Sequence, residues 1–338
     1  MNAAQNIAIC GVNWLGDACM TMPALQAFHR KSPDVKITML TRPALRPLWE
    51  MHPAITETLP LSPTLKSMRQ AARELRERQI ETVYLFPNSW RSALVPFFAG
   101  TANRIGQAGH RRRILLTETT PLSDRAIQGH QQWEYVDILK LKLEALPEPQ
   151  ITIPEQIKVT MQASLPPSHD THWVGLLPGA ARGPSKQWPK SHFISAAKQL
   201  SEKSPCRFVL MGTAAEAELC GEIEAAIGPK ALSLAGKTSL QELIAALSLC
   251  RTVICNDSGG MHLAATAGTP VVAIYGITDP AKTGPLGAGH KLICAEGISP
   301  SRDLPRDSIP ARNALQSITP ERVVEAVLNT INTRTAKP

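Results

Sequence analysis

The feature that most constrains this fold is a strand that ends in polar and glycine residues directly before a helix. The strand covers residues 253–256, the loop is Asp257-Ser258-Gly259-Gly260, and the helix begins near Met261. Gly268 ends this helix, and a second apolar strand runs from Pro270 to Ile274. Such strand-loop-helix-strand units build open α/β sheets, in which ligands bind at the carboxyl ends of the strands.

The loop after this strand has the chemistry of a phosphate site. Ser258, Gly259 and Gly260 let the backbone approach an anion, and the first N–H groups of the helix point outward with the positive end of its dipole. The alternative is a plain tight connection that binds nothing, because short connections of this kind are common. Asp257 and His262 add two further polar side chains within the same six residues, which favours a ligand site.

The pattern of strand, polar loop, helix and strand occurs at the start of each half of the chain. In the first half it covers strand 6–10, loop 11–17, helix 20–30 and strand 36–41, and in the second half strand 173–177, loop 178–189, helix 192–203 and strand 207–211. With 338 residues the chain also exceeds the usual size of one core. We predict an α/β protein with two doubly wound domains, 1–168 and 169–338, joined by the proline-rich stretch 146–170.

Composition excludes several classes of protein. The chain is 43% hydrophobic and 19% charged, as is usual for a globular protein, and its longest uncharged run, 258–278, is interrupted by glycines and a proline. No secretory signal precedes the first strand, so we expect a cytoplasmic protein. The seven cysteines form no C-x-x-C pair, which predicts reduced thiols and no zinc site.

Positive charge is concentrated in one part of the chain. The net charge is +8, and residues 36–113 hold thirteen Lys or Arg against five Asp or Glu. Arg69, Arg73 and Arg76 recur at helical spacing beside glutamates, so we interpret them as a solvated helix face. The tightest cluster is Arg104 with Arg111, Arg112 and Arg113, which suits an anionic lipid or a phosphorylated substrate. Nucleic acid is a weaker fit, because only 4% of residues are aromatic and no known binding module is present.

Three further side chains are candidates for chemistry. Asp17 is a candidate general base in the loop before the first helix, with a helix N-cap as the alternative. Lys186 is either a solvated side chain or a cation that neutralises a departing diphosphate, and Glu216 either binds a ribose or simply begins a helix. The chain lacks the G-x-G-x-x-G sequence of dinucleotide dehydrogenases after its first strand, and Gly236-Lys237-Thr238 lacks the first glycine of a P-loop.

Three motifs together resemble a known family. Gly16-Asp17 before a Met-Pro-Ala-Leu helix, the segment Pro178 to Pro189 and the loop Asn256 to His262 are similar to the heptosyltransferases of glycosyltransferase family 9. The resemblance spans roughly residues 6–332 in the family's order. It implies a GT-B fold, with two Rossmann-like domains facing a central cleft. It also implies an inverting transfer, without metal or cofactor, of heptose from ADP-heptose to the inner core of lipopolysaccharide.

The resemblance also implies roles for individual residues. Asp17 matches the catalytic base, Lys186 the lysine that stabilises the ADP leaving group, and Glu216 an acidic position near the nucleotide sugar. The donor loop and the acceptor cluster complete the implied site; they are Asp257, Ser258, Gly259, Gly260 and His262, and Arg104, Arg111, Arg112 and Arg113 respectively. An acceptor of this kind places the protein at the inner face of the cytoplasmic membrane, held there by basic residues.

One segment departs from the family pattern. Residues 298–317 contain neither Cys nor His, whereas many close members carry both before the last helix. Two other functions stand beside heptose transfer, and this departure motivates the second of them. They are a glycosyltransferase with another nucleotide-sugar donor, and a nucleotide-sugar-binding protein without catalysis.

Overall fold

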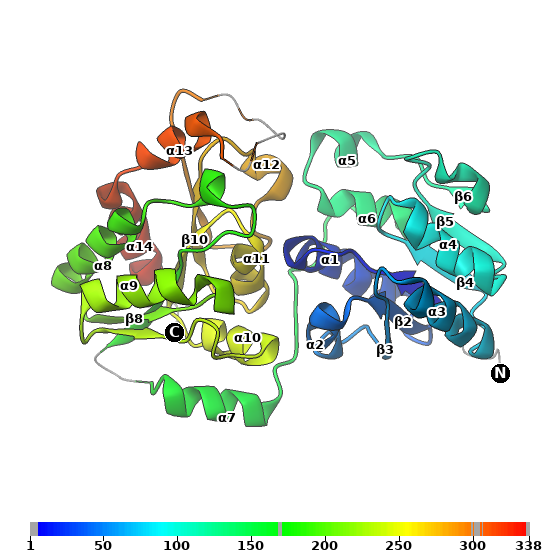
Figure 1. The fold of residues 1–338 in the computed structure, drawn as a ribbon, viewed down its shortest axis with the longest axis horizontal. Coiled ribbons are helices and arrows are strands. Elements are labelled where there is room, and N and C mark those ends of the chain that lie inside the picture. The colour runs from blue at the N-terminus through cyan, green and yellow to red at the C-terminus, as the bar shows by residue number, and fades with distance from the viewer. Residues whose placement is uncertain (1–5, 168–170, 299, 301–304, 306, 336–338) are drawn as a thin grey trace. The chain divides into compact units, whose positions relative to one another are not determined.

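The chain forms two compact units, Met1–Thr152 and Ile153–Pro338 (Figure 1). The computed structural model describes all residues except 1–5, 168–170, 299, 301–304, 306 and 336–338. The expected boundary at residue 168 falls outside the described residues. The contacts divide the chain before this position, because the helix 155–164 packs against the helix 240–248 of the second unit.

The first unit is built on a six-stranded parallel sheet with the strand order β3-β2-β1-β4-β5-β6. Ile7 of β1 pairs with Ile37 of β2 on one side and with Thr82 of β4 on the other. The strands are β1 (Asn6–Cys10), β2 (Lys36–Thr41), β3 (Glu57–Pro60), β4 (Thr82–Leu85), β5 (Asn103–Gly106) and β6 (Glu118–Thr119). This is the order of a doubly wound sheet, and it reverses direction between β1 and β4.

Helices connect these strands. They are α1 (Leu15–Lys31), α2 (Arg46–Glu50), α3 (Leu65–Glu77), α4 (Trp90–Ala99), α5 (Asp124–Gln128) and α6 (Gln132–Ile138), with the 3₁₀ turns η1 (Pro43–Leu45) and η2 (Arg112–Leu115). In α3 the residues Met68, Ala71, Ala72 and Leu75 are buried, which is the i, i+3, i+4, i+7 spacing of an amphipathic helix. On its opposite face Arg73 pairs with Glu77, as expected for a solvated face, whereas Arg76 donates to the carbonyl oxygens of Phe98 and Ala99 in α4.

The second unit repeats the same topology. Its six parallel strands have the order β12-β11-β10-β7-β8-β9, which equals the order of the first sheet once the strands are renumbered from β7. They are β7 (His172–Leu177), β8 (Cys206–Leu210), β9 (Ala231–Ser233), β10 (Thr252–Asn256), β11 (Val271–Tyr275) and β12 (Lys291–Cys294). The predicted doubly wound sheet in each half is confirmed, and here the direction reverses between β7 and β10.

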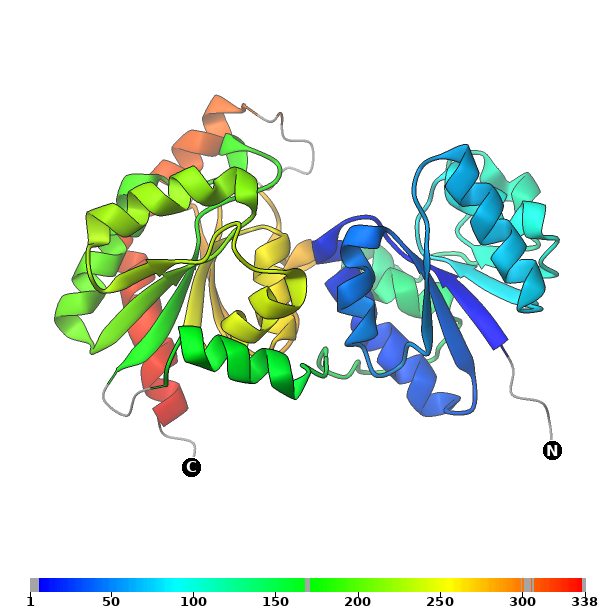
Figure 2. The same cartoon turned by 60° about the horizontal axis from the view of Figure 1, so that its bottom comes forward.

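The helices of the second unit flank its sheet (Figure 2). They are α7 (Glu155–Ser164), α8 (Lys190–Lys203), α9 (Ala217–Ile227), α10 (Leu240–Ser248), α11 (Gly259–Thr266), α12 (Pro280–Thr283), α13 (Ile309–Gln316) and α14 (Pro320–Thr335), with the 3₁₀ turns η3 (Pro184–Lys186) and η4 (Ala214–Glu216). Ser239 caps α10 by accepting from the N–H of Glu242, whose carboxylate accepts from the N–H of Ser239, which is a capping box. Pro320 is the first residue of α14, a position that proline suits because its missing N–H has no helical partner there.

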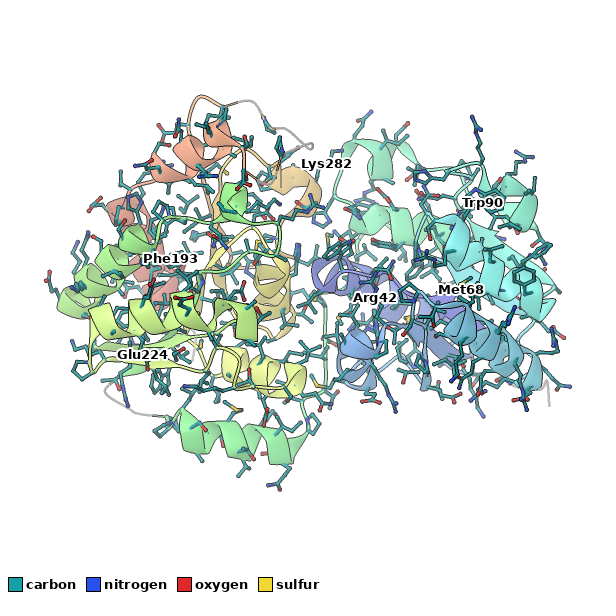
Figure 3. The ribbon with its side chains drawn as sticks, in the orientation of Figure 1. Arg42, Met68, Trp90, Phe193, Glu224 and Lys282 are labelled. Atoms are coloured by element: carbon teal, nitrogen blue, oxygen red, sulfur yellow. The ribbon has the colours of Figure 1, made fainter. Side chains whose placement is uncertain are left out.

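Each unit has its own apolar core. All residues of β10 and β11 are buried, as is typical of parallel strands covered by helices on both faces. In the second unit Phe193 of α8, labelled in Figure 3, packs on this core with Phe208 and Trp188. Among the described residues, no helix is both long and apolar enough for a membrane span.

Candidate functional site

The phosphate-type loop lies where the sequence predicts it, between the end of β10 and the start of α11. Ser258 is the N-cap of α11 in an extended conformation, and Gly259 and Gly260 are its first two helical residues. Within the described part of the chain, the Ser258 side chain makes no capping hydrogen bond to the helix. A Cβ added at Gly260 would lie 2.9 Å from Cδ1 of Leu177 at the end of β7, so only glycine fits without displacing that side chain. The first amides of α11 thus lie at the carboxyl edge of the sheet.

An ion pair joins this loop to the loop after β7. Nζ of Lys186 lies 2.5 Å from Oδ2 of Asp257, and the Lys186 and Asp257 side chains are only 14% and 7% exposed. Oδ2 also accepts a hydrogen bond of 2.7 Å from Oγ1 of Thr278, in the loop after β11. Three loops that follow neighbouring strands therefore meet at one carboxylate, at the place where the sheet reverses direction. The ammonium lies beside the N-terminus of α11, so both positive groups share one edge of the sheet.

Asn256, the last residue of β10, holds the loop after β7 in place. It is fully buried, and its Nδ2 donates to the carbonyl oxygens of Pro178, at 2.8 Å, and Gly179, at 3.3 Å. Its Oδ1 accepts from the backbone N–H of Trp188 at 2.9 Å. Both ends of the loop that carries Lys186 are thus tied to the strand that carries Asp257. The sequence motif contains Asn256, but its spacing gave no sign of this positioning role.

The turn around Lys186 has a second support. Oγ of Ser185 donates to the carbonyl oxygen of Pro305 at 2.7 Å and accepts from the N–H of Ser308 at 2.8 Å. These partners lie in the segment 298–317 that departs from the family pattern, parts of which are outside the described residues. In this chain the described part of that segment packs on the turn η3.

Glu216 begins a helical turn through hydrogen bonds to Thr213, and His262 is a buried residue of α11. Oε2 of Glu216 accepts from the backbone N–H of Thr213 at 2.7 Å and from its hydroxyl at 2.9 Å, which is a capping box at the start of η4. A Cβ added at Gly179 would lie 1.8 Å from Oε1 of Glu216, so the carboxylate covers the loop after β7. The helix-start interpretation of Glu216 is confirmed; a contact with the nucleotide sugar stays a prediction. His262 is buried in α11.

Asp17 lies in the first turn of α1, at the reversal point of the first sheet. The helix begins at Leu15, five residues before the expected start at Met20, and its N-cap is Trp14. The alternative that Asp17 is the N-cap is therefore wrong. The side chain is half-buried, and its charge adds to burial in raising the pKa of the Tyr135 phenol on α6. A carboxylate thus follows β1 at the edge of the sheet where ligands bind in this topology.

The arginine cluster divides into buried and exposed members. Arg112 is fully buried, and its guanidinium donates to the carbonyl oxygens of Gln107, Pro87 and Ser89. Burial lowers its pKa. The expectation that Arg112 contributes to a surface patch is wrong, because its donors hold two loops together. Arg104 is half-buried and donates to the carbonyl oxygens of Leu115 and Thr101.

Arg111 and Arg113, on either side of Arg112, are exposed. They are therefore the members of the cluster that present charge to solvent. The predicted acceptor contacts of Arg104, Arg111 and Arg113 stay predictions.

The cysteines are free thiols, and six of them are buried. Burial raises the pKa of Cys206 to about 11 and that of Cys10, Cys220 and Cys250 to about 12. Protonated thiols of this kind are poor nucleophiles and poor metal ligands. Among the described residues no group of three or more His, Cys, Asp or Glu side chains could hold a metal ion.

Comparison with known proteins agrees with this geometry. Residues 68–309, more than half of the chain, match the model of glycosyltransferase family 9 (heptosyltransferase). The chain belongs to glycosyltransferase family 9. It is 31% identical to lipopolysaccharide heptosyltransferase 2 of Escherichia coli K12, over 95% of this chain and 97% of the relative. It is also 30% identical to lipooligosaccharide heptosyltransferase 2 of Haemophilus ducreyi, over 95% and 98%.

A solved structure gives the same result for the fold. The E. coli ADP-heptose lipopolysaccharide heptosyltransferase II superposes with a TM-score of 0.85 at 29% identity, covering 98% of this chain and all of that chain. The predicted GT-B fold, seen here as two parallel six-stranded sheets, and the resemblance to the heptosyltransferases of this family are confirmed. The protein is a glycosyltransferase, and its family supports heptose transfer in the synthesis of lipopolysaccharide.

Proposed function

We propose that this protein transfers heptose from ADP-heptose to the inner core of lipopolysaccharide, with inversion at the anomeric carbon. The observation that carries this proposal is the meeting of Lys186, Asp257 and the N-terminus of α11 at the reversal point of the second sheet. A lysine ammonium and unpaired helix amides suit the diphosphate of a nucleotide sugar. The solved relative is named as an ADP-heptose lipopolysaccharide heptosyltransferase, and this name supports the same donor.

In this proposal the first unit supplies the base. The Asp17 carboxylate takes the proton of an acceptor hydroxyl, and the oxygen attacks the anomeric carbon of the heptose. The bond from this carbon to the β-phosphate oxygen breaks, and ADP leaves with the electron pair. Lys186 and the first amides of α11 stabilise the negative charge that develops on the leaving phosphate. We expect this chemistry to proceed without a divalent metal ion, because the chain itself supplies the positive groups.

The acceptor binds through the first unit. Inner-core acceptors carry phosphate and sugar-acid groups, and the exposed Arg111 and Arg113 suit such anions. Arg104, which is half-buried, contributes charge from the same cluster. Because the acceptor is a membrane lipid, we place the reaction at the inner face of the cytoplasmic membrane.

The deciding experiment offers ADP-heptose with two lipid acceptors and follows heptose addition by mass spectrometry. One acceptor ends in the bare sugar acid and the other already carries a first heptose. Addition to the second acceptor alone, in the presence of EDTA, is the expected result. If neither acceptor gains heptose although the protein is folded and binds ADP, the proposal is wrong, and a panel of other nucleotide sugars follows.

A substitution tests the base. Asp17→Asn should lower transfer by about 10²- to 10⁴-fold, the usual contribution of a general base, and leave ADP affinity unchanged. Asp34→Asn is the matched control, because Asp34 is exposed in the turn after α1. Full activity of Asp17→Asn would remove Asp17 from this role.

A further inference from the structure

Helix α4 has two apolar faces, and one of them is open to solvent. Ala93, Val95 and Ala99 are buried against the core of the first unit. On the other side Trp90, Phe97 and Phe98 are 39%, 42% and 60% exposed, and Leu94 is half-buried between them. The spacing 90, 94, 97, 98 places these four side chains on one stripe of the helix. Figure 3 labels Trp90 on α4 and Met68 on the neighbouring helix α3.

The turn η2 packs against α4 and adds a further exposed apolar side chain. Ile114 is 75% exposed, whereas the next residue, Leu115, is buried in the same core as α4. Arg112 fixes the turn to the start of α4, because its Nη1 donates to the carbonyl oxygen of Ser89 at 3.3 Å and to Oγ of Ser92 at 3.1 Å. We call Trp90, Leu94, Phe97, Phe98 and Ile114 the α4–η2 face. It is held in place by buried hydrogen bonds rather than lying on a loose loop.

The charged residues that flank the α4–η2 face in the sequence are all arginines. Residues 82–117 contain five arginines and no Asp or Glu. Arg91, Arg111 and Arg113 are exposed, and the guanidinium of Arg104 lies 5.6 Å from the ring centroid of Phe97. On the neighbouring helix α3 Arg73 pairs with Glu77, Arg78 just after this helix pairs with Glu74, and Arg76 donates to the carbonyl oxygens of Phe98 and Ala99 in α4. In the segment 82–117, by contrast, no acidic residue compensates the arginines.

We propose that the α4–η2 face binds the surface of a bilayer that contains anionic lipids. Aromatic side chains insert at the boundary of head groups and acyl chains, and arginines beside them attract anionic head groups. A second copy of the chain fits less well, because a two-fold interface would bring the same arginines of both copies together. The inference rests on the proposed function in one respect: the bilayer is taken to be the membrane that holds the lipid acceptor of the first unit.

The test is cosedimentation of the full chain with vesicles, without donor or acceptor. Binding to vesicles of phosphatidylcholine and phosphatidylglycerol is expected, with much weaker binding to phosphatidylcholine alone and a loss at high salt. The double variant Phe97→Ser/Phe98→Ser should weaken binding by about tenfold or more, because the two apolar side chains whose transfer from water into the bilayer favours binding are gone. Arg91→Gln should weaken it by about fivefold, and only on the anionic vesicles.

Two control variants distinguish binding through the α4–η2 face from non-specific binding of the protein to vesicles. Val159→Ser on α7 also removes an exposed apolar side chain, and Lys203→Gln on α8 also removes an exposed charge, so both should bind vesicles like the unchanged chain. Wild-type-like vesicle binding by Phe97→Ser/Phe98→Ser would overturn the inference. So would a concentration-dependent dimer in sedimentation velocity that this double variant abolishes, because the face would then bind a second copy.

The two proposals fail separately. Phe97→Ser/Phe98→Ser should keep full heptose transfer to a water-soluble acceptor fragment without acyl chains, and lose transfer to acceptor embedded in anionic vesicles. Vesicle binding without any heptose transfer would leave the docking face intact and refute the proposed function. Transfer to both acceptors at unchanged rates in this variant would refute the docking face and leave the function intact.

Discussion

Replacing Asn256 tests whether the candidate donor site depends on one buried side chain. Its amide makes three hydrogen bonds, to Pro178, Gly179 and Trp188, and is fully buried. In Asn256→Ala these bonds are lost, and the N–H of Trp188 and two carbonyl groups must find water. Three lost bonds at about 1 kcal/mol each predict destabilisation by about 3 kcal/mol where water replaces the amide, and more where a buried group stays without a partner.

The isosteric variant Asn256→Asp makes the prediction sharper. Its carboxylate can still accept from the N–H of Trp188 but would face the carbonyl oxygens of Pro178 and Gly179 without a proton to donate. The folded state should therefore raise the pKa of the new carboxyl above about 3.9, its value in the unfolded chain. Between these two pKa values the folded state binds more protons than the unfolded state, so stability should fall as pH rises through this window.

The assay is urea unfolding over a pH series, combined with hydrogen exchange of the segment 178–189. Asn256→Ala and Asn256→Asp should both exchange faster at this segment, and Asn256→Asp should approach wild-type stability only at acidic pH. Asn313→Ala is the matched control, because Asn313 is exposed on α13, and its effect should stay within about 0.5 kcal/mol. A change of that small size in Asn256→Ala, with unchanged exchange, would refute the reasoning.

Three further predictions follow from individual side chains. Burial lowers the pKa of His52 to about 4, so the unfolded state binds an extra proton between pH 6.5 and 4. The free energy of unfolding should therefore fall by about 3 kcal/mol as the pH drops from about 6.5 to 4. His52→Gln should flatten this pH dependence in urea unfolding, and an unchanged slope would exclude His52 as its source. Cys294 is the one cysteine that is not buried, so a maleimide should label the native protein there first. Cys294→Ser should abolish this early labelling, measured by mass spectrometry. Early labelling of another cysteine would contradict the burial of the other six thiols. Ser185→Ala loses its bonds to Pro305 and Ser308, so ADP affinity should fall by about three- to tenfold, measured by calorimetry, with Ser195→Ala on α8 as control.

The local organisation of the chain could be predicted from its sequence. Apolar strands of five or six residues, glycine and serine at their ends and capped helices such as α10 are signals that lie close together along the chain. Their alternation predicts two parallel doubly wound sheets, and the crossover rule for such units places the loops after β7 and β10 at one edge. For this reason Lys186 and Asp257 could be chosen as candidates although 71 residues separate them.

Only the tertiary structure decided which side chains are buried and which groups they meet. Arg112 and Arg113 are neighbours in the sequence, yet one is fully buried and the other exposed, because the partners of Arg112 come from the loop before α4 and the loop after β5. The role of Asn256 likewise depends on carbonyl groups more than seventy residues away. Helix α4 is apolar on nearly all sides, so its sequence pattern could not show which face the core leaves open. Burial and pairing depend on contacts between distant segments, which a pattern along one chain does not contain.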